Sequence, residues 1–217
     1  MNLEQARFNM VEQQIRTWEV LDQEVLDLLY VIPREEFVSA EHRALAFSDL
    51  ELPIGEGERM WQPKLEARVV QELALKKTDR VLEVGTGSGY LTALLAHRAA
   101  EVCSVELRPA LAAFGRENLA RYGSDNVVLE SGDAARGWAG HAPYDAIVLT
   151  GSTPVLPRAL LEQLNPGGRL FAVVGEAPAM QARLVACAAP GAWRSVDLFE
   201  TVIRPLANAE QAPRFRF

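Results

Sequence analysis

Three glycines at alternate positions constrain this chain more than any other sequence feature. They stand in the stretch Val81-Leu82-Glu83-Val84-Gly85-Thr86-Gly87-Ser88-Gly89-Tyr90. The branched apolar run before them is typical of a buried parallel strand over residues 80–84, and residues 90–97 are predicted to form the next helix. Alternate glycines permit unusual backbone dihedrals and close approach of a ligand, while a helix start offers free N–H groups and a positive dipole end. We therefore expect an anionic or polar ligand on this loop.

The spacing of the glycines separates two candidate ligands, a nucleotide phosphate and the carboxylate of S-adenosylmethionine (SAM). The dinucleotide fingerprint G-x-G-x-x-G needs a glycine at the position of Tyr90, and the loop has no Walker lysine. The loop instead resembles motif I of class I SAM-dependent methyltransferases, with an acidic residue two positions before the first glycine. This resemblance implies that the methionine end of SAM is held by Glu83, Gly85, Thr86, Gly87, Ser88, Gly89 and Tyr90. Two alternatives stay open: Glu83 caps a neighbouring loop, and Tyr90 belongs to the core.

A second strand points to the same cofactor. The apolar run over residues 102–105 ends in Glu106, about twenty residues past the glycine loop, where a carboxylate can accept both hydroxyls of a ribose. Glu106, with Leu107 beside it, is therefore predicted to bind the ribose. The alternative is that Glu106 is an exposed acid at the start of a helix over residues 107–122.

The rest of the C-terminal part alternates strand and helix patterns. Strand patterns occur at 126–130, 144–150 and 169–174. Helices are predicted after Pro109 and Pro157, because proline favours the first helical turn, and repeated βα units imply a parallel sheet. After a predicted turn at residues 166–168, the apolar runs 181–188 and 196–204 indicate an antiparallel addition. The predicted fold class is α/β: a Rossmann-like class I methyltransferase fold with a mostly parallel sheet flanked by helices, an antiparallel end strand and an N-terminal helical extension.

The N-terminal part precedes the cofactor unit. Apolar residues recur there at helical spacing in two segments, Met10, Val11, Ile15 and Trp18, then Leu21, Val25, Leu28 and Leu29. A short helix is predicted over residues 33–41, and the Gly- and Pro-containing stretch 49–63 is predicted to be a structured loop without regular secondary structure. Pro63 is predicted to begin a helix. We predict a single domain over residues 1–217, with N-terminal helices and a substrate loop in 1–63 and a SAM-binding core in 64–217.

Composition argues against several other function classes. A net charge of -7 and a pI near 5.1, without a run of Lys or Arg, disfavour a nucleic-acid partner. Cys103 and Cys187 lie in apolar runs and are predicted to be buried reduced thiols. The histidines His42, His97 and His141 lack metal-ligand spacing, so no metal is predicted. The sequence has no signal peptide or membrane-length apolar run, which predicts a cytoplasmic protein without a membrane partner, and no pattern indicates an oligomeric state.

Further motifs, taken in chain order, resemble one family. Ahead of the glycine loop stand Phe37-Val38, Asp49, Leu52-Pro53-Ile54-Gly55-x-Gly57 and Gln62-Pro63. After it stand Ser131-Gly132-Asp133, Gly137-Trp138, Pro143-Tyr144-Asp145, Pro166-Gly167-Gly168 and Pro205-Leu206. Together these motifs resemble the protein-L-isoaspartate O-methyltransferases, which methylate the abnormal side-chain carboxylate of aged proteins for repair. The resemblance implies SAM as cofactor, S-adenosylhomocysteine as product and a peptide or protein carrying isoaspartate as partner.

The same resemblance implies roles for further residues. Asp133 and Ala134 are expected to bind the adenine edge, although a turn aspartate that bonds its own backbone is an alternative for Asp133. The loop over residues 54–62, with Asp49, is expected to border the methyl acceptor.

The chain departs from the family pattern where the substrate is expected. Where the family loop has threonine and serine in G-Q-T-I-S-Q-P, this chain has Arg59 and Trp61. An indole has no hydroxyl and fills more volume, so the acceptor pocket must be reshaped or partly closed. Arg59 either pairs with the substrate carboxylate or is a solvated charge near Glu58. Arg204 also replaces a usually apolar residue before Pro205-Leu206.

The reaction implied by the family needs no general base, because a carboxylate with a pKa of about 4 is already ionised at neutral pH. Catalysis then comes from positioning and from removal of water. Three hypotheses follow: an isoaspartyl carboxyl methyltransferase with a modified loop, a methyltransferase of the same scaffold with another acceptor, and a SAM-binding protein without turnover. The bulk of Trp61 favours the third, and fold alone does not decide among them.

Overall fold

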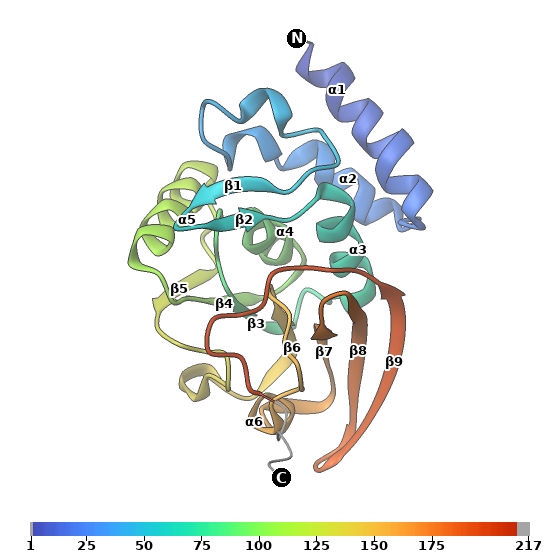
Figure 1. The fold of residues 1–217 in the computed structure, drawn as a ribbon, viewed down its shortest axis with the longest axis vertical. Helices are drawn as coiled ribbons and strands as arrows, with labels where there is room; N and C mark the ends of the chain where they lie inside the picture. Colours follow the sequence, from blue (N-terminus) through green and yellow to red (C-terminus); the bar gives the residue numbers. More distant parts are fainter. Residues whose placement is uncertain (1, 212–217) are drawn as a thin grey trace.

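A seven-stranded sheet runs through the centre of the protein (Figure 1). The computed structural model describes residues 2–211. In spatial order, the strands are β5 (Val127–Ser131), β4 (Glu101–Glu106), β3 (Arg80–Val84), β6 (Tyr144–Leu149), β7 (Leu164–Glu176), β8 (Ala179–Ala189) and β9 (Ala192–Glu200). Neighbouring strands from β5 to β7 are parallel, whereas β8 and β9 pair antiparallel. The predicted α/β class with a mostly parallel sheet is confirmed, and its antiparallel end consists of two strands.

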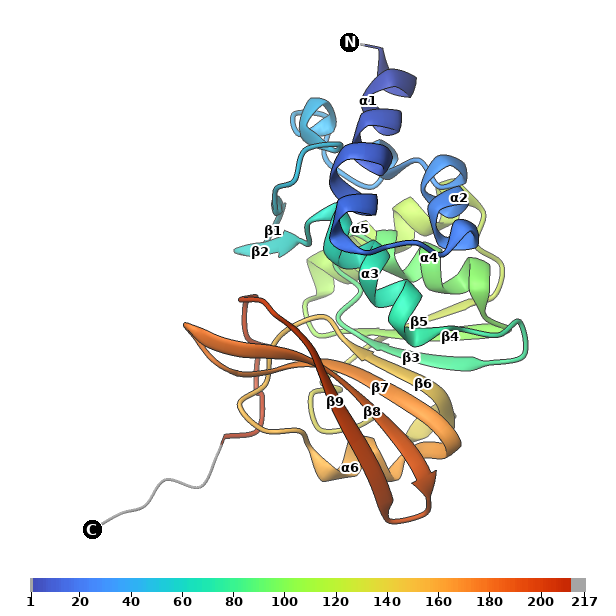
Figure 2. The ribbon, with the colours of Figure 1, turned by 90° about the vertical axis from the view of Figure 1, so that its right-hand side faces the viewer.

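Helices cover both faces of this sheet (Figure 2). On one face lie α3 (Pro63–Leu73), α4 (Tyr90–Arg98) and α5 (Pro109–Tyr122), and on the other lies α6 (Arg158–Glu162). Adjacent residues along a strand point into apolar clusters on opposite faces of the sheet. Val102 belongs to the cluster under α3 and α4, whereas Cys103 belongs to the cluster on the face covered by α6. This alternation follows from the two-residue period of a strand and explains why apolar residues occupy both faces of the parallel strands.

The N-terminal segment is helical and packs over α3 (Figure 2). It consists of α1 (Leu3–Asn9), a π-helical stretch η1 (Met10–Ile15), a 3-10 turn η2 (Arg16–Trp18) and α2 (Gln23–Val31). The apolar residues predicted at helical spacing are largely its buried side: Met10, Val11 and Ile15 have no exposed surface. The helix predicted over residues 33–41 is wrong in extent, since the 3-10 turn η3 (Arg34–Glu36) forms there, followed later by η4 (Arg43–Leu45).

The prediction that residues 49–63 lack regular structure is wrong. They contain an antiparallel hairpin made of β1 (Leu52–Gly55) and β2 (Glu58–Met60). Gly55, Glu56 and Gly57 form its turn with φ of +95°, +52° and +77°. The two glycines that look like breakers in the sequence thus supply left-handed turn conformations. So short a hairpin depends on packing, which the buried ends Leu52 and Met60 provide.

The antiparallel end also differs in its bounds from the prediction. β7 starts at Leu164, so the predicted turn at residues 166–168 is part of the strand, next to a register shift opposite Tyr144 and Ala146. A Cβ on Gly168 would lie 2.8 Å from the Asn165 carbonyl oxygen, which explains the glycine. β9 ends at Glu200, before the predicted limit at residue 204. Within residues 2–211, the helices are too short or too polar to cross a membrane.

Candidate functional site

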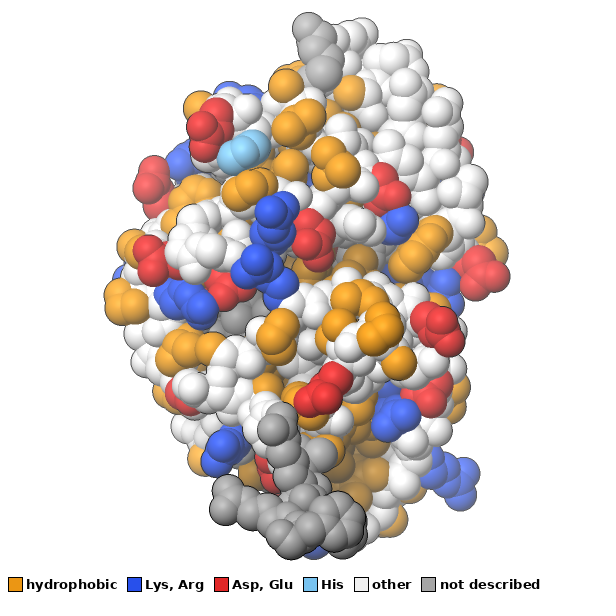
Figure 3. All heavy atoms as spheres, in the orientation of Figure 1, with side chains coloured by type: hydrophobic (Ala, Val, Ile, Leu, Met, Phe, Trp, Pro, Cys, Tyr) orange, Lys and Arg blue, Asp and Glu red, His pale blue; other side chains and the backbone are white. Residues whose placement is uncertain are grey.

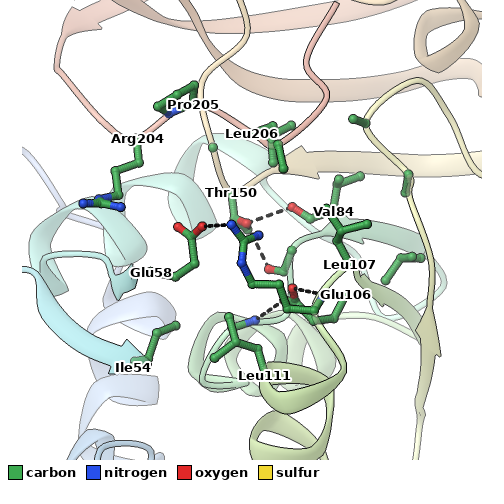
Figure 4. Close-up of a pocket in the computed structure, with 18 of the residues that line it drawn as sticks. Ile54, Glu58, Val84, Glu106, Leu107, Leu111, Thr150, Arg204, Pro205 and Leu206 are labelled. Carbon is green, nitrogen blue, oxygen red and sulfur yellow. Dashed lines mark hydrogen bonds and ion pairs between the residues drawn. The ribbon is translucent and has the colours of Figure 1, made fainter. Parts of the chain in front are cut away.

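A cleft opens where the order of the strands reverses. β3 has β4 on one side and β6 on the other, and connections leave this point in opposite directions, which is the usual place for a ligand in a parallel α/β sheet. A solvent-open cavity of about 760 Å³ lies at the carboxyl ends of these strands (Figure 4). Its volume falls in the range of small-molecule sites.

The structure brings most of the predicted site residues to this cleft. Those that line it are Arg59, Trp61, Gly85, Gly87, Glu106, Leu107, Asp133 and Ala134. A smaller cavity of about 350 Å³ shares Arg59, Trp61, Gly85 and Gly87 with it and is also lined by Glu83, Thr86 and Ser88. Asp49, Gly89 and Tyr90 line neither cavity.

The glycine loop is shaped by contacts that allow no side chain at its first position. Gly85 has a φ of +99°, and a Cβ there would lie 2.1 Å from the hydroxyl oxygen of Thr150. That hydroxyl donates to the carbonyls of Val84 (2.8 Å) and Gly85 (2.9 Å), so Thr150 ties the end of β6 to the end of β3 (Figure 4). Gly89, with a φ of +82°, is the N-cap of α4 and packs against Leu119 of α5. The loop is therefore fixed from both sides before any ligand binds.

Glu106 faces the cleft from the end of β4, and its carboxylate is oriented by the backbone. The N–H of Gly87 donates to one oxygen at 2.9 Å, and the N–H of Arg108 donates to the other at 3.0 Å. Glu106 is buried and lines the cleft, so it is not an exposed helix-start acid. Each oxygen keeps a lone pair for a further donor, which suits two neighbouring hydroxyls.

Asp133 has the backbone contact of a turn aspartate and also faces the cleft; its binding to adenine stays a prediction. One carboxylate oxygen accepts from the N–H of Ala135 at 3.0 Å, as a turn aspartate does, and the other accepts from the Asn208 side chain at 2.9 Å. The residue also lines the cleft together with buried Ala134. Leu107 and Leu111 add apolar surface to the same cavity (Figure 4), and apolar surface next to a carboxylate suits a flat polar ring.

Glu83 lies beneath the glycine loop, fully buried, and anchors it from below. Its Oε2 accepts from the hydroxyls of Thr92 (2.5 Å) and Ser104 (2.6 Å), and Ser104 in turn lies 2.6 Å from the hydroxyl of Thr86 in the loop. Within the described chain its Oε1 has no hydrogen-bond partner. Burial raises the pKa of Glu83 from 4.5 to about 8, although the bonds from Ser104 and Thr92 act in the opposite direction. The carboxyl is thus mainly protonated at neutral pH.

This raised pKa predicts a pH-dependent stability. Between pH 4.5 and about 8, the unfolded chain binds fewer protons at Glu83 than the folded chain, so the group destabilises the fold increasingly as pH rises through that window; below pH 4.5 both states are protonated and the effect vanishes. A Glu83→Gln variant lacks this titration. Its free energy of unfolding, relative to the unmodified chain, should rise by at most about 1.4 kcal/mol per pH unit across the window.

Denaturant unfolding near pH 5, 6.5 and 8 measures this difference. Glu117→Gln is the control, because the Glu117 side chain is 73% exposed, and it should leave the pH profile unchanged. Parallel profiles for Glu83→Gln and the unmodified chain would contradict a protonated Glu83.

Tyr90 and Asp49 have other partners. The Tyr90 ring is buried edge-on to Phe37 at 5.4 Å, and the guanidinium of Arg34 lies 5.0 Å from its centre, so its side chain belongs to the core. Asp49 accepts from Lys64 at 2.6 Å on the surface.

The β1–β2 hairpin forms the opposite wall of the cleft. Trp61, directly after β2, is only 7% exposed and lines both cavities, as does Arg59. Glu58 pairs with Arg108 at 2.6 Å across the cleft, whereas Arg59 is exposed and has no ion pair among residues 2–211 (Figure 4). Glu58 is therefore not the partner of Arg59. Arg204 donates to the Gly57 carbonyl and lines the same cleft. Figure 3 shows Lys and Arg side chains gathered beside a hollow near this hairpin.

Arg34 is a residue that the sequence did not single out. It is 1% exposed and pairs with Glu66 of α3, while its other donors reach the carbonyls of Ala46 (2.9 Å) and Trp61 (2.6 Å). Burial lowers the pKa of Arg34 to about 10. Because it also lies over the Tyr90 ring, Arg34 connects the hairpin wall to the helix that follows the glycine loop. A lone arginine after a proline gives no sequence signal of these distant partners.

Comparison with known proteins identifies the family of the chain. The sequence profile of protein-L-isoaspartate(D-aspartate) O-methyltransferases matches residues 5–208. A protein-L-isoaspartate O-methyltransferase of Methanoculleus marisnigri is 47% identical over 169 residues, which cover 78% of this chain and 77% of that protein. One from Anaeromyxobacter dehalogenans is 44% identical over 195 residues, covering 89% and 93%.

Solved structures agree with this assignment. A protein-L-isoaspartate O-methyltransferase superposes with a TM-score of 0.80 at 25% identity, over 94% of this chain and 66% of that one. A Plasmodium falciparum protein described as a putative member, in complex with S-adenosyl-L-homocysteine, gives a TM-score of 0.78 at 20% identity over 92% and 97% and supports the fold. With a profile that spans nearly the whole chain and relatives above 40% identity, this protein belongs to the protein-L-isoaspartate(D-aspartate) O-methyltransferase family of SAM-dependent O-methyltransferases.

Proposed function

We propose that this protein transfers a methyl group from SAM to the side-chain carboxylate of isoaspartyl residues in peptides or proteins, as a repair reaction. The observation that carries the proposal is the cleft itself, which places a glycine loop and an oriented carboxylate on one wall and a hairpin with free donors on the other. The third hypothesis, SAM binding without turnover, is separated from this proposal by the experiment below.

The first wall fits SAM. Gly85 and Gly87 leave the backbone open to a small charged group, and Glu106 offers two oriented oxygens for ribose hydroxyls. The rest of the cavity is lined by Leu107, Asp133 and Ala134. An adenine there would have an apolar side chain on one edge and a carboxylate on another. When bound, SAM supplies a methyl group on a positively charged sulfur. Protonated Glu83 below the loop adds no full charge to this wall at neutral pH.

The second wall fits a carboxylate acceptor. Arg59 has a guanidinium free to attract the carboxylate, and Arg204 adds a second positive charge at the rim. The positive charge of Arg59 and Arg204 is confined to this wall, whereas the whole chain has a net charge of -7. The indole N–H of Trp61 makes no hydrogen bond to the described part of the chain, so it can donate to an acceptor oxygen in place of the serine hydroxyl of the family loop. Trp61 thus narrows the pocket and still provides a donor.

The roles of these residues are to hold and orient the acceptor and to exclude water. The acceptor carboxylate is ionised at neutral pH, so no residue has to remove a proton. A buried indole beside the carboxylate displaces water from it, and reduced hydration makes the carboxylate a better nucleophile. The Glu58–Arg108 pair joins the two walls of the cleft.

Methyl transfer from labelled SAM to two peptides tests the proposal. The peptides differ only in an isoaspartyl or a normal aspartyl linkage. We expect label in the isoaspartyl peptide alone. SAM binding without label in either peptide would contradict the proposal and leave either another acceptor or a protein without turnover, whereas equal labelling would show that the protein does not select the isoaspartyl linkage.

Variants of Trp61 test its part in the reaction. Trp61→Phe keeps an aromatic ring but lacks the N–H, and Trp61→Ser restores the family hydroxyl with less bulk. If the indole N–H holds the acceptor, Trp61→Phe should raise the KM for the isoaspartyl peptide about 10-fold, the effect of one lost hydrogen bond to a charged group, and leave the Kd of SAM unchanged. Trp61→Ser should retain more activity than Trp61→Phe. Equal kinetics for Trp61→Phe and the unmodified chain would show that the ring only fills space.

A further inference from the structure

A cluster of three possible metal ligands lies away from the cleft, on the opposite face of the sheet from α3 and α4. Cys103 comes from β4, Glu130 from β5 and His141 from the 3-10 turn η5 (Ala139–His141). One sulfur, one carboxylate oxygen and one imidazole nitrogen of these residues all lie within 4.8 Å of one another. In the sequence, Cys103 and His141 are far apart, which is why histidine spacing predicts no metal.

Neighbouring side chains hold Glu130 and His141 in place beside Cys103. His141 Nε2 lies 2.9 Å from one oxygen of Glu130, and the indole N–H of Trp138 donates to the other oxygen at 2.6 Å. A second carboxylate, Glu101, lies behind the imidazole with its oxygen 3.8 Å from Nδ1. Cys103 is buried, and its thiol has no hydrogen-bond partner in the described part of the chain. Glu130 and His141 are half-buried, so an ion can enter from their side.

Sulfur, imidazole nitrogen and carboxylate oxygen are the ligand set of Zn²⁺ and related transition metals, whereas a thiol disfavours Mg²⁺ and Ca²⁺. Around a tetrahedral zinc ion, such atoms lie about 3.3 to 3.8 Å apart, so the most distant pair would close by up to about 1.5 Å and the 2.9 Å contact between His141 and Glu130 would open slightly. The carboxylate behind His141 and the N–H on Glu130 are the kind of outer contacts that orient metal ligands. The carboxylates of Glu101 and Glu130 make the surroundings of the cluster negatively charged. Arg80, 3.9 Å from Glu101, offsets this charge only in part.

We propose that Cys103, Glu130 and His141 form a site for one divalent transition-metal ion of the zinc class, with water as the remaining ligand. On binding, His141 exchanges its contact with Glu130 for the metal, and the thiol proton is released to solvent. Glu130 and His141 flank the turn that carries Asp133 and Ala134, so the ion would close this segment into a loop and brace the far wall of the cleft.

Cobalt(II) is the probe that tests this proposal. The full-length protein, freed of metal with a chelator, is titrated with Co²⁺ while its absorption is recorded. We expect a near-ultraviolet band from thiolate-bound cobalt and visible bands of a four-coordinate ion, saturating at one ion per chain and reversed by Zn²⁺. The absence of a thiolate band would overturn the proposal.

Matched variants locate the ion. Cys103→Ser and Cys103→Ala should lose the thiolate band, and Cys187→Ser should keep it, since Cys187 is equally buried but outside the cluster. His141→Gln should bind Co²⁺ about 100-fold more weakly, whereas His42→Gln should bind it with unchanged affinity. Trp138→Phe should lower the affinity for Co²⁺ about 10-fold, because Glu130 loses the indole N–H that orients it. Circular dichroism and SAM binding verify that each variant is folded. Binding that persists unchanged in both His141→Gln and the Cys103 variants would show adventitious surface binding and overturn the proposal.

Discussion

Gly85→Ala is expected to lower kcat/KM by about 100-fold or more, because the added methyl group collides with a fixed neighbour. The new Cβ would lie 2.1 Å from the Thr150 hydroxyl oxygen, which two carbonyls hold in place. The φ of +99° adds a backbone strain of about 1 to 3 kcal/mol for alanine. The loop must therefore move, and the Kd of SAM should rise with the loss of rate. Isothermal titration with SAM and steady-state kinetics measure the two effects.

Gly123→Ala is the matched control for backbone strain. Gly123 has a φ of +87°, but a Cβ there meets nothing within 4 Å and the residue lies at the end of α5, away from the cleft. This variant should lose some stability and keep its affinity for SAM. Adding Thr150→Ala to Gly85→Ala removes the colliding oxygen and should recover part of the SAM affinity. If Gly85→Ala binds SAM as tightly as Gly123→Ala does, the contact with Thr150 does not shape the loop.

Arg34→Met is expected to destabilise the protein by about 3 to 5 kcal/mol, since it leaves the buried carboxylate of Glu66 without its partner. The side chains of this pair are 1% and 4% exposed. The variant should also lose methyl-transfer activity at temperatures where it is still folded, because the Trp61 carbonyl loses the donor that positions the hairpin end. Denaturant unfolding gives the stability, and the KM for the isoaspartyl peptide reports on the acceptor wall.

An exposed pair serves as the comparison. Arg158 and Glu162 form an ion pair with side chains 80% and 53% exposed, so Arg158→Met should cost no more than about 1 kcal/mol. In the double variant Arg34→Met/Glu66→Leu no charge is left buried, and stability should largely return while the raised KM persists. Recovery of both stability and KM in that double variant would show that Arg34 only neutralises Glu66 and does not position Trp61.

The sequence by itself determined the parts of this protein that depend on local pattern. Apolar runs followed by glycine or an acid predict parallel strands, and the structure has β3 and β4 with Gly85 and Glu106 at their ends. Proline at a helix start predicts α3 and α5, which begin at Pro63 and Pro109. These features are encoded over a few residues, through backbone dihedrals, strand period and missing N–H donors, so a single stretch carries the information.

Only the tertiary structure decided features whose partners are distant in the chain. The hairpin of β1 and β2 forms because its buried ends, Leu52 and Met60, stabilise it. The glycines of its turn, taken alone, predict an irregular loop. Arg34 is buried because Glu66 balances its charge and nearby carbonyls accept its hydrogen bonds. Cys103 of β4 lies close to His141 of η5 only because the sheet brings these distant segments together. Tyr90 likewise turns into the core beside Phe37 and not toward the cleft. In each case the free energy comes from burial and pairing between segments, which a local pattern does not contain.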